Sequence, residues 1–413
     1  MTDRAILHSD LNAFYASAEI VMHPEWQGRP VAVCGSVEDR HGIVLAKSQQ
    51  AKEAGVRTGM VVREARALCP DLIVAEPHYD RYMTFSRLVR KIYARYSDLI
   101  EPFGMDECWI DVTGSARRWG TPVEIAERIR REVRKETGLT VSVGVSFNKV
   151  FAKLASDLKK PDAVTVIARE NMKETVWPLP VSSLLYAGPA TVSRLERFGI
   201  RTVGELAAAN EETLRGWMGA NAMLLMRFAR GEDLSRVMRD GESMPVKSVG
   251  HGITCNADLY TPDEVRRVLL ELSQDVGMRL KEAGLLACGI SVCVKDNRLE
   301  CEQFMSSLPA PTRSRREIAE AAYALFCRRY EMVRGVRAVT VTAIRPVREK
   351  SERQLDCFGD YRKKDRLDRL ESAVDNMTLR FGAAALRPAD VLTNFKTQNR
   401  HSYLSVLPHG VVK

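Results

Sequence analysis

Two adjacent carboxylates, Asp106 and Glu107, stand between short apolar stretches whose pattern indicates the two strands of a hairpin. Neighbouring carboxylates repel each other and raise each other's pKa unless a cation neutralises them. Mg²⁺ prefers such oxygen donors. A third carboxylate, Asp10, follows a strand pattern at residues 4–9 and precedes a helix. If the two strands are neighbours in one sheet, the three carboxylates converge and could hold two Mg²⁺ ions for phosphoryl transfer.

The elements that must position these carboxylates can be read from periodicity and capping residues. Apolar side chains repeat at helical spacing over residues 82–96 and predict an amphipathic helix that leads into the hairpin. Thr121 and Glu124 predict a second helix that starts with a capping box, and Gly138 predicts its end. Alternating residues at 140–147 then predict a strand. This order of strands and helices favours an α+β catalytic domain.

Three ordered stretches, residues 10–17, 105–107 and 142–161, together resemble the motifs of Y-family DNA polymerases, the translesion class, and most closely the bacterial DinB, or polymerase IV, type. The similarity continues through residues 199–206 and 247–250, so it covers most of the chain. Three motifs in the right order are a specific signal, because a single short motif often matches by chance.

The resemblance implies an α+β, multidomain right-hand polymerase. Its parts would be a ferredoxin-like palm, small fingers, a helical thumb with a helix-hairpin-helix and an α+β little finger. A chain of 413 residues has room for several such domains. The expected boundaries are 1–11 and 78–168 for the palm, 12–77 for the fingers, 169–236 for the thumb, 237–246 for a linker, 247–346 for the little finger and 347–413 for a charged tail.

The same resemblance implies how two Mg²⁺ ions would be held. Asp10 and Asp106 would bridge both ions, and Glu107 would hold the ion beside the primer 3′-hydroxyl. The main-chain carbonyl of Leu11 would bind the ion that accompanies the nucleotide. The first ion would lower the pKa of the hydroxyl, and the second would screen the triphosphate.

The resemblance also implies a deoxynucleoside triphosphate site. Tyr15 takes the steric-gate position, where an aromatic ring leaves no room for a 2′-hydroxyl, and Lys160 matches the lysine that contacts the triphosphate. Gln49 and Lys52 depart from the family pattern of tyrosine and arginine, and lysine lacks the planar fork of arginine, so we expect weaker nucleotide binding. The expected nucleotide-binding residues are Asn12, Ala13, Phe14, Tyr15, Gln49, Lys52 and Lys160.

The charge balance favours a polyanionic partner, here primer–template DNA. Lys and Arg number 62 against 53 Asp and Glu, which gives a net charge of +9. Residues 311–345 are rich in arginine; a solvated helix face alone would explain such a run, but beside the motifs a phosphate track is favoured. Residues 184–200 resemble a helix-hairpin-helix, which would bind phosphates through main-chain N–H groups. The expected DNA-binding residues are Lys149, Gly188, Lys247, Ser248, Arg313, Arg315 and Arg337.

Composition and targeting signals predict a soluble monomer in the bacterial cytoplasm, associated with the nucleoid. The nine cysteines lack metal-ligand spacing, which indicates reduced thiols. The N-terminus has no leader pattern, and no apolar run approaches the ~20 residues needed to cross a bilayer.

The charged tail carries a short motif for a protein partner. Gln354, Leu355 and Phe358 resemble the pentapeptide by which bacterial replication proteins dock on the sliding clamp. An arbitrary amphipathic patch is the alternative interpretation of five residues. Docking would raise the effective concentration of the enzyme at the primer end.

The function predicted from these features is template-directed, Mg²⁺-dependent DNA synthesis with low fidelity past damaged template. Two alternatives stay open at this point. One is a catalytically silent scaffold that binds DNA and the clamp, which the departures at Gln49 and Lys52 would permit. The other is a palm-type nucleotidyl cyclase, which needs paired carboxylates but no basic DNA track. The intact carboxylates oppose the scaffold, because acidic groups without metal would repel phosphate.

Overall fold

The structure is a computed structural model that describes residues 4–36, 40, 42–242, 244–349, 361–382, 385–386 and 389. The described residues fall into two compact units. The N-terminal unit contains residues 4–35 and 43–242, and the C-terminal unit contains residues 36, 40 and 42 and the described residues from 244 onward. No helix in the described part of the chain is both long and apolar enough to cross a membrane.

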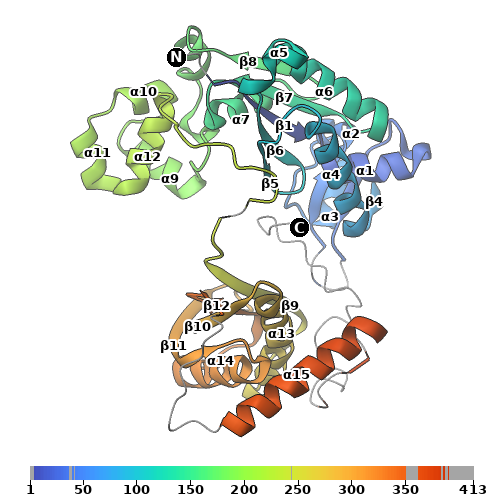
Figure 1. Ribbon diagram of the computed structural model, residues 1–413, viewed down its shortest axis with the longest axis vertical. Helices are drawn as coiled ribbons and strands as arrows, with labels where there is room; N and C mark the ends of the chain where they lie inside the picture. Colours follow the sequence, from blue (N-terminus) through green and yellow to red (C-terminus); the bar gives the residue numbers. More distant parts are fainter. Residues whose placement is uncertain are drawn as a thin grey trace. The chain divides into compact units, whose positions relative to one another are not determined.

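A five-stranded sheet forms the centre of the N-terminal unit (Figure 1). Its strand order is β5-β6-β1-β7-β8, in which β1 runs antiparallel to both of its neighbours and β7 and β8 are parallel. Because β1 is the middle strand, its residues are buried on both faces. The strands are β1 (Ile6–Leu11), β5 (Ile100–Phe103), β6 (Glu107–Asp111), β7 (Val141–Ser146) and β8 (Val164–Ile167).

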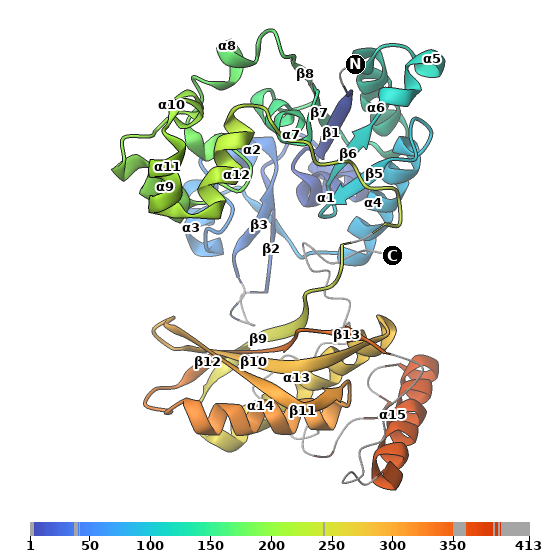
Figure 2. The ribbon, with the colours of Figure 1, turned by 60° about the vertical axis from the view of Figure 1, so that its left-hand side comes forward.

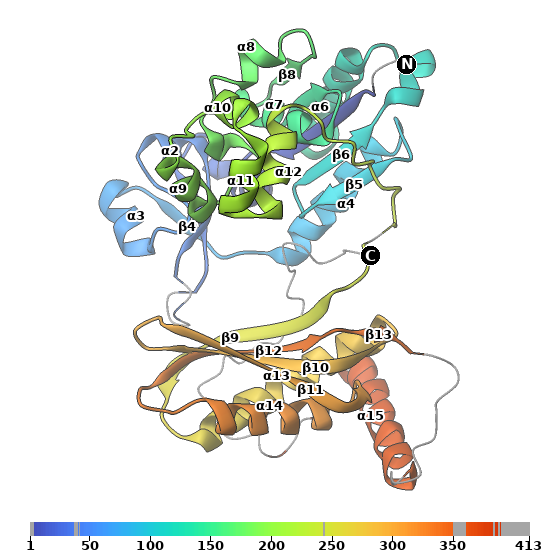
Figure 3. The same ribbon diagram turned by 90° about the vertical axis from the view of Figure 1, so that its left-hand side faces the viewer.

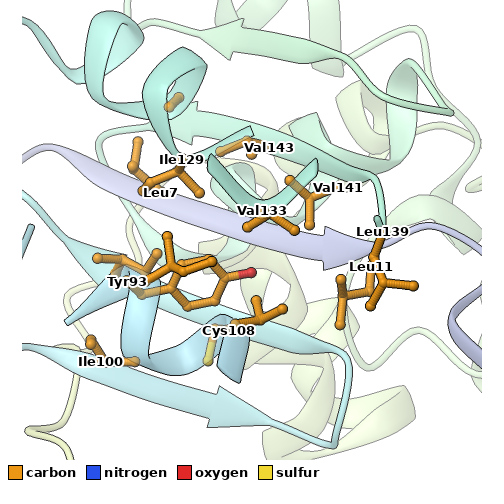
Figure 4. Close-up of a cluster of buried hydrophobic side chains, with 14 of the residues drawn as sticks. Leu7, Leu11, Tyr93, Ile100, Cys108, Ile129, Val133, Leu139, Val141 and Val143 are labelled. Atoms are coloured by element: carbon orange, nitrogen blue, oxygen red, sulfur yellow. The ribbon is translucent and has the colours of Figure 1, made fainter. Parts of the chain in front are cut away.

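One face of this sheet is covered by helices α4 (Tyr79–Tyr93) and α6 (Pro122–Thr137). Alternate strand residues such as Leu7 and Val143 point to this face and pack with Ile129 of α6, as Figure 4 shows. The opposite face is covered by α7 (Lys149–Leu158), whose Ala152 packs with Ile6 and Trp109. The side-chain period of two along each strand therefore divides the sheet into two different faces.

Helix α6 forms where the sequence predicts it. The side chain of Thr121 accepts a hydrogen bond from the Glu124 N–H, and the Glu124 carboxylate accepts one from the Thr121 N–H. At the other end Gly138 adopts φ 74°, a left-handed conformation that glycine takes without strain. The capping box and the glycine thus confirm both predicted ends, and β7 follows at once.

Two smaller parts complete the N-terminal unit. Residues 12–77 hold a three-stranded sheet, β3-β2-β4, with its own apolar cluster around Val44 and Val62. Residues 169–230 form short helices around a core that includes Leu195 and Leu225. Their elements are α1 (Phe14–Met22), β2 (Val31–Cys34), β3 (Val44–Lys47), α2 (Gln49–Glu53), α3 (Val62–Leu68), β4 (Ile73–Ala75), α8 (Met172–Val176), α9 (Pro189–Arg197), α10 (Val203–Ala208), α11 (Glu211–Met218) and α12 (Ala220–Ala229), with 3₁₀ turns at Pro24–Trp26 and Val181–Ser183. A 3₁₀ turn at Thr113–Ser115 and the short helix α5 (Ala116–Trp119) connect β6 to α6.

The C-terminal unit is a sheet of order β11-β10-β12-β9 with helices α13 and α14 on one face (Figure 2). This combination of a sheet with two helices supports the α+β expectation. Edge strand β11 was not predicted from the sequence, because Pro309 and Pro311 argue against a central strand; an edge position tolerates them. The elements are β9 (Ser248–Leu259), α13 (Pro262–Glu282), β10 (Leu285–Asp296), β11 (Cys301–Thr312), α14 (Arg315–Arg329), β12 (Val336–Ile344) and β13 (Val347–Arg348).

A further helix, α15 (Tyr361–Phe381), packs on the C-terminal unit (Figure 3). The Glu371 carboxylate accepts hydrogen bonds from the Ser314 hydroxyl at 2.9 Å and the Arg315 N–H at 3.1 Å. Asp375 forms an ion pair with Lys281 at 2.7 Å. These contacts fix the helix at the start of α14, so this part of the charged tail is folded.

Candidate active site

The pairing of β1 with β6 brings the three predicted carboxylates together. Asp10 lies directly opposite Glu107 in the register of the two strands. Asp106 occupies the turn before β6, and its carbonyl accepts a hydrogen bond from the Leu11 N–H at 3.0 Å. The strand adjacency that the sequence left open is therefore present, and the carboxylates share one corner of the sheet.

These carboxylates are electrostatically unequal. Burial, followed by the charges of Asp10 and Glu107, raises the pKa of Asp106 to about 6. Burial also raises the pKa of Asp10, although Lys160 works in the opposite direction. Burial works to raise the pKa of Glu107 too, but the contact with His8 and the charge of Lys153 outweigh it and lower that pKa to about 2. Of the three carboxylates, Asp106 is therefore the one whose ionised form the protein stabilises least.

Two lysines neutralise the other two carboxylates. The Lys160 ammonium lies 2.7 Å from Asp10 Oδ2 and also 2.7 Å from Asp157 Oδ1. The Lys153 ammonium contacts Glu107 Oε2. No ion pair to Asp106 forms within the described part of the chain. Three acidic groups of which one lacks a counter-charge are a donor set that suits a hard divalent cation.

The side chains are not already arranged around a vacant metal position. Among the described residues, no three His, Cys, Asp or Glu side chains come together closely enough to hold a metal ion as they stand. The lysine contacts explain this spacing, because each ammonium draws one carboxylate toward α7 or the loop after it. Binding of a cation to Asp10 and Glu107 would have to compete with these ion pairs.

Asn12, an expected nucleotide contact, forms several hydrogen bonds within the protein. Its side-chain amide donates to Ser142 Oγ at 2.9 Å, and its Oδ1 accepts from the Asp162 N–H at 2.9 Å. Its own N–H donates to the Thr140 carbonyl at 2.9 Å. With these groups engaged, Asn12 ties the end of β1 to the loop that carries Lys160, so it positions that loop.

The start of α1 places an aromatic ring next to the carboxylates. Ala13 has φ 48°, a left-handed conformation that is costly for a residue with a Cβ and is often found at functional sites. Phe14 is buried in the core, so its side chain is not free to contact a nucleotide. Tyr15 is half-buried; its ring stacks on Tyr82 at 4.5 Å and meets Tyr79 edge-on at 5.9 Å. Burial and the Asp106 charge raise the pKa of the Tyr15 phenol.

Gln49 and Lys52 lie on the short helix α2, which Ser48 caps, and both side chains are exposed. The Gln49 amide donates to Glu53 Oε1 at 2.9 Å. The position of Lys52 on the surface is compatible with a phosphate contact, and no described bond holds its ammonium elsewhere.

The expected DNA-binding residues divide into exposed and internally paired groups. Gly188 is exposed at the N-cap of α9, and Lys247 and Ser248 are exposed at the start of β9. Lys149, in contrast, pairs with Glu101 at 2.6 Å and lies 4.3 Å above the Trp109 ring, with 12% of its side chain exposed. Lys149 therefore stabilises the sheet face under α7 and does not offer a free charge to DNA.

The arginines of the C-terminal unit show the same division. Arg315 is only 9% exposed and contacts Asp375 of α15, an ion pair with which a DNA phosphate would have to compete. Arg313 pairs with Glu349 at 2.5 Å. Arg337 is half-buried on β12, and no described ion pair engages it. The clamp-motif residues Gln354, Leu355 and Phe358 lie outside the described residues.

Sequence reasoning missed two groups that contact the carboxylates. His8 lies two residues before Asp10 and faces Glu107, and Lys153 lies one turn after Lys149 on α7. The recurrence of lysine at i and i+4 was the available signal for Lys153, since such residues share one face of a helix. A histidine within a buried strand pattern was the signal for His8.

Comparison with known proteins identifies the family. Residues 9–157 match the model of the impB/mucB/samB family, and residues 246–357 match the model of its C-terminal domain. A relative named DNA polymerase IV from Acetivibrio thermocellus is 43% identical over 93% of this chain and 96% of its own length. The corresponding figures for DNA polymerase IV of Moorella thermoacetica are 38%, 95% and 97%, and for DNA polymerase IV 2 of Bacillus subtilis 35%, 95% and 96%.

A solved structure shows the same fold. A Y-family DNA polymerase chimera superposes with a TM-score of 0.73 and covers 84% of this chain and 100% of its own, at 22% sequence identity. At that identity the likeness bears on the fold, and it confirms the predicted α+β class. The identities of 35–43% over nearly the whole chain bear on descent. Together they confirm the resemblance seen in the motifs: this chain belongs to the Y family of DNA polymerases.

Proposed function

We propose that this chain is a DNA-directed DNA polymerase of the translesion class, which adds deoxynucleotides to a primer 3′ end and releases pyrophosphate. Family membership supports the reaction class. The observation that carries the proposal is the register that sets Asp10 opposite Glu107 with Asp106 in the adjoining turn. Phosphoryl transfer needs positioned negative groups that bind metal, and little else from the protein.

We further propose that Asp10, Asp106, Glu107 and the Leu11 carbonyl hold two Mg²⁺ ions. The residues fit this role because Asp106 is a partly buried carboxylate that no ion pair within the described residues neutralises. When bound, such ions would activate the primer 3′-hydroxyl and screen the charge of the triphosphate. Lys160 is 32% exposed at the edge of this corner, and we assign it to the triphosphate.

Tyr15 is the proposed steric gate. Its ring is held by stacking on Tyr82 and by the edge contact with Tyr79, so it cannot easily swing away from a ribose 2′-hydroxyl. Tyr15→Ala should therefore incorporate ribonucleotides far more readily than the wild type. Single-nucleotide incorporation of matched deoxy- and ribonucleotides measures this; equal sugar discrimination in the two proteins would remove the assignment.

Lys52 and Gln49 are the proposed contacts of the small sheet with the nucleotide phosphates. Both are exposed, and Lys52 can supply a point charge without the bidentate geometry of arginine. Lys52→Ala should raise the KM for the nucleotide, and Lys52→Arg should lower it. A KM that does not respond to either change would exclude a phosphate contact at this position.

DNA contacts are proposed at the exposed positions and at the half-buried Arg337, which no described ion pair engages. The start of α9 at Gly188 can present main-chain N–H groups to a phosphate. In the C-terminal unit, Lys247 directly precedes β9, Ser248 begins it, and Arg337 lies on β12. In a Y-family polymerase, α9 would belong to the thumb and the three residues of the C-terminal unit to the little finger. The five-stranded sheet would form the palm. Lys247→Ala should reduce the salt dependence of primer–template binding by about one phosphate contact. An unchanged salt slope would exclude it.

We propose that Leu355 and Phe358 dock on the sliding clamp as apolar anchors, with Gln354 beside them, and that the protein works as a monomer in the cytoplasm at the nucleoid. The support is the sequence of this motif. Clamp-stimulated synthesis should be lost in Phe358→Ala while basal synthesis persists. Sedimentation should give the mass of one chain, and a fluorescent fusion should follow the nucleoid.

The experiment that tests the proposed function is primer extension on undamaged and abasic templates with Mg²⁺ and four deoxynucleotides. The wild type should extend the primer, Asp106→Ala should not, and the control Asp98→Ala, which changes an exposed carboxylate, should match the wild type. Synthesis past the abasic position supports the translesion role. If neither the wild type nor Asp106→Ala extends while both bind primed DNA in a salt-dependent way, the protein is a scaffold.

A further inference from the structure

His8 is a fully buried polar side chain on β1 that points to the same face of the sheet as Asp10. Its Nε2 lies 3.2 Å from Glu107 Oε2, and its Nδ1 lies 2.8 Å from the Ser156 hydroxyl. Among the described residues, Nε2 has no hydrogen bond with good angles. The polar group nearest to it is the Glu107 carboxylate. A buried polar atom without a hydrogen-bond partner destabilises the fold, so the Glu107 carboxylate is the partner that Nε2 needs.

The neighbours of His8 decide which ring nitrogen carries the proton. A neutral imidazole has a single N–H, and its two nitrogens face different partners: the Glu107 carboxylate only accepts, whereas the Ser156 hydroxyl can donate or accept. If Nδ1 held that proton, the lone pair of Nε2 would face the Glu107 carboxylate. With the proton on Nε2, the ring donates to Glu107 and the Ser156 hydroxyl can donate to Nδ1. The hydroxyl also lies 2.7 Å from the Lys153 carbonyl, which is its competing acceptor.

The close approach of α7 to the sheet makes this chain of contacts possible. Gly144 of β7 lies directly opposite His8 in the strand register. A Cβ at position 144 would lie 1.9 Å from the Ala152 carbonyl oxygen and 2.5 Å from the Ser156 nitrogen. Glycine therefore lets α7 rest on the strand backbone, and this brings Ser156 to the ring. On the other side, the Trp109 ring packs against His8 edge-on at 5.2 Å.

The contacts on Glu107 are one-sided. His8 and the Lys153 ammonium both reach Oε2, and within the described residues no hydrogen bond or ion pair engages Oε1. A carboxylate held through one oxygen presents the other in a fixed direction. Histidine–carboxylate pairs around metal sites act in this way, and their loss commonly costs about 10- to 100-fold in metal affinity or activity.

We propose that His8, supported by Ser156, is a positioning residue that holds Glu107 through Oε2 and directs Oε1 toward the metal ion beside the primer 3′-hydroxyl. This inference rests on the proposed function of the same corner of the sheet. His8 itself touches neither substrate nor metal. Its contribution is to reduce the orientations that Glu107 must lose when the metal binds.

Two substitutions separate the two nitrogens of the ring. His8→Gln places an amide N–H near the position of Nε2 and keeps a donor for Glu107, whereas His8→Asn reaches only the position of Nδ1 and keeps the contact with Ser156. We expect His8→Asn to lower kcat about 10- to 100-fold and to raise the Mg²⁺ concentration for half-maximal rate, with an unchanged KM for the nucleotide. His8→Gln should recover most of both losses. His23→Gln is the control, because His23 forms an exposed pair with Glu25 at 3.1 Å.

A second readout is independent of catalysis. Mn²⁺ binding to the full-length protein without DNA, followed by electron paramagnetic resonance, should weaken about 10-fold in His8→Asn and little in His8→Gln or His23→Gln. Ser156→Ala should weaken it in the same direction by less. The proposal is overturned if His8→Asn binds Mn²⁺ as the wild type does, or if the Asn and Gln variants lose binding equally and in step with their melting temperatures.

This design keeps the two proposals apart. A wild type that binds Mn²⁺ but extends no primer would refute the proposed polymerase function, and the order of Mn²⁺ affinities would still test the role of His8. Primer extension that is lost in Asp106→Ala but insensitive to both His8 variants would refute the positioning role alone.

Discussion

The two faces of the central sheet use alternate residues of the same strands but are built for different purposes. Leu7, Ile110 and Val143 point toward α4 and α6 and form a closed apolar layer. The intervening positions of the same strands point toward α7 and include His8 and Glu107. One face therefore gains stability from burial of apolar area. On the other face, buried charged groups need ion pairs or hydrogen bonds to offset their loss of hydration.

Within the described residues, the buried charges of the polar face are almost all paired, and the unpaired carboxylate of Asp106 lies in the turn that adjoins this face. Lysines of α7 pair with Glu101 and Glu107, and Lys160 after the helix pairs with Asp10. Asp106 has no such partner in the described part of the chain, and its pKa is raised to about 6. A protein that only needed stability would have replaced this carboxylate. The difference between the faces thus separates residues kept for folding from residues kept for chemistry.

The largest effect is expected at Gly144, where α7 rests on the polar face. Gly144→Ala introduces a Cβ that meets backbone atoms of α7 at 1.9 and 2.5 Å, so the helix must move away. We expect the free energy of unfolding to fall by about 3 kcal/mol, the scale of severe overpacking. We also expect kcat to fall at least about tenfold, because Ser156 and Lys153 retreat from His8 and Glu107.

Denaturant unfolding followed by tryptophan fluorescence measures the stability of the relevant unit, because Trp26, Trp109, Trp119, Trp177 and Trp217, all five tryptophans, belong to the N-terminal unit. Gly114→Ala is the matched control, since nothing lies within 4 Å of a Cβ built there. Wild-type stability and kcat in Gly144→Ala would show that α7 does not depend on this close approach.

The apolar face should respond in stability alone. Ile129 of α6 is fully buried against Val143 and its neighbours, and Ile129→Ala leaves a cavity there. We expect a loss of about 3 kcal/mol in the free energy of unfolding with kcat unchanged under conditions where the variant is folded. Ile129→Val should lose only about 1 kcal/mol. A fall in kcat of the folded Ile129→Ala protein would show that the two faces are coupled.

Much of the fold followed from local patterns. The ends of α6 were predicted from Thr121, Glu124 and Gly138, because capping depends only on neighbouring residues. Edge strand β11 was missed, since its prolines argue against a strand unless its edge position is known. The fold of α15 onto the C-terminal unit was also left open, because its anchors Lys281 and Ser314 are distant in sequence.

The site was predictable to the extent that its residues are ligands by type. Asp10, Asp106 and Glu107 stood out as carboxylates at strand ends and in a turn, whereas their register is a long-range property. Lys149 and Arg315, both expected to contact DNA, are instead engaged by carboxylates of this chain. Charge predicts attraction to phosphate only when the charge is free, and the partners Glu101 and Asp375 lie 48 and 60 residues away in sequence.

The smallest expected effect lies at the water-exposed start of α6, which supports the apolar face without being part of it. Thr121→Ala removes the hydroxyl that accepts from the Glu124 N–H, so one main-chain donor must bond to water instead. Since water can replace that bond, the free energy of unfolding should fall by only about 1 kcal/mol, with kcat unchanged. Thr121→Ser keeps the hydroxyl and should stay near wild type. The same fluorescence measurement compares this loss with that of Ile129→Ala. If the two losses were equally large, the cap of α6 would stabilise the protein as much as its buried face does. The apolar face of the sheet would then not be the main source of stability in this unit.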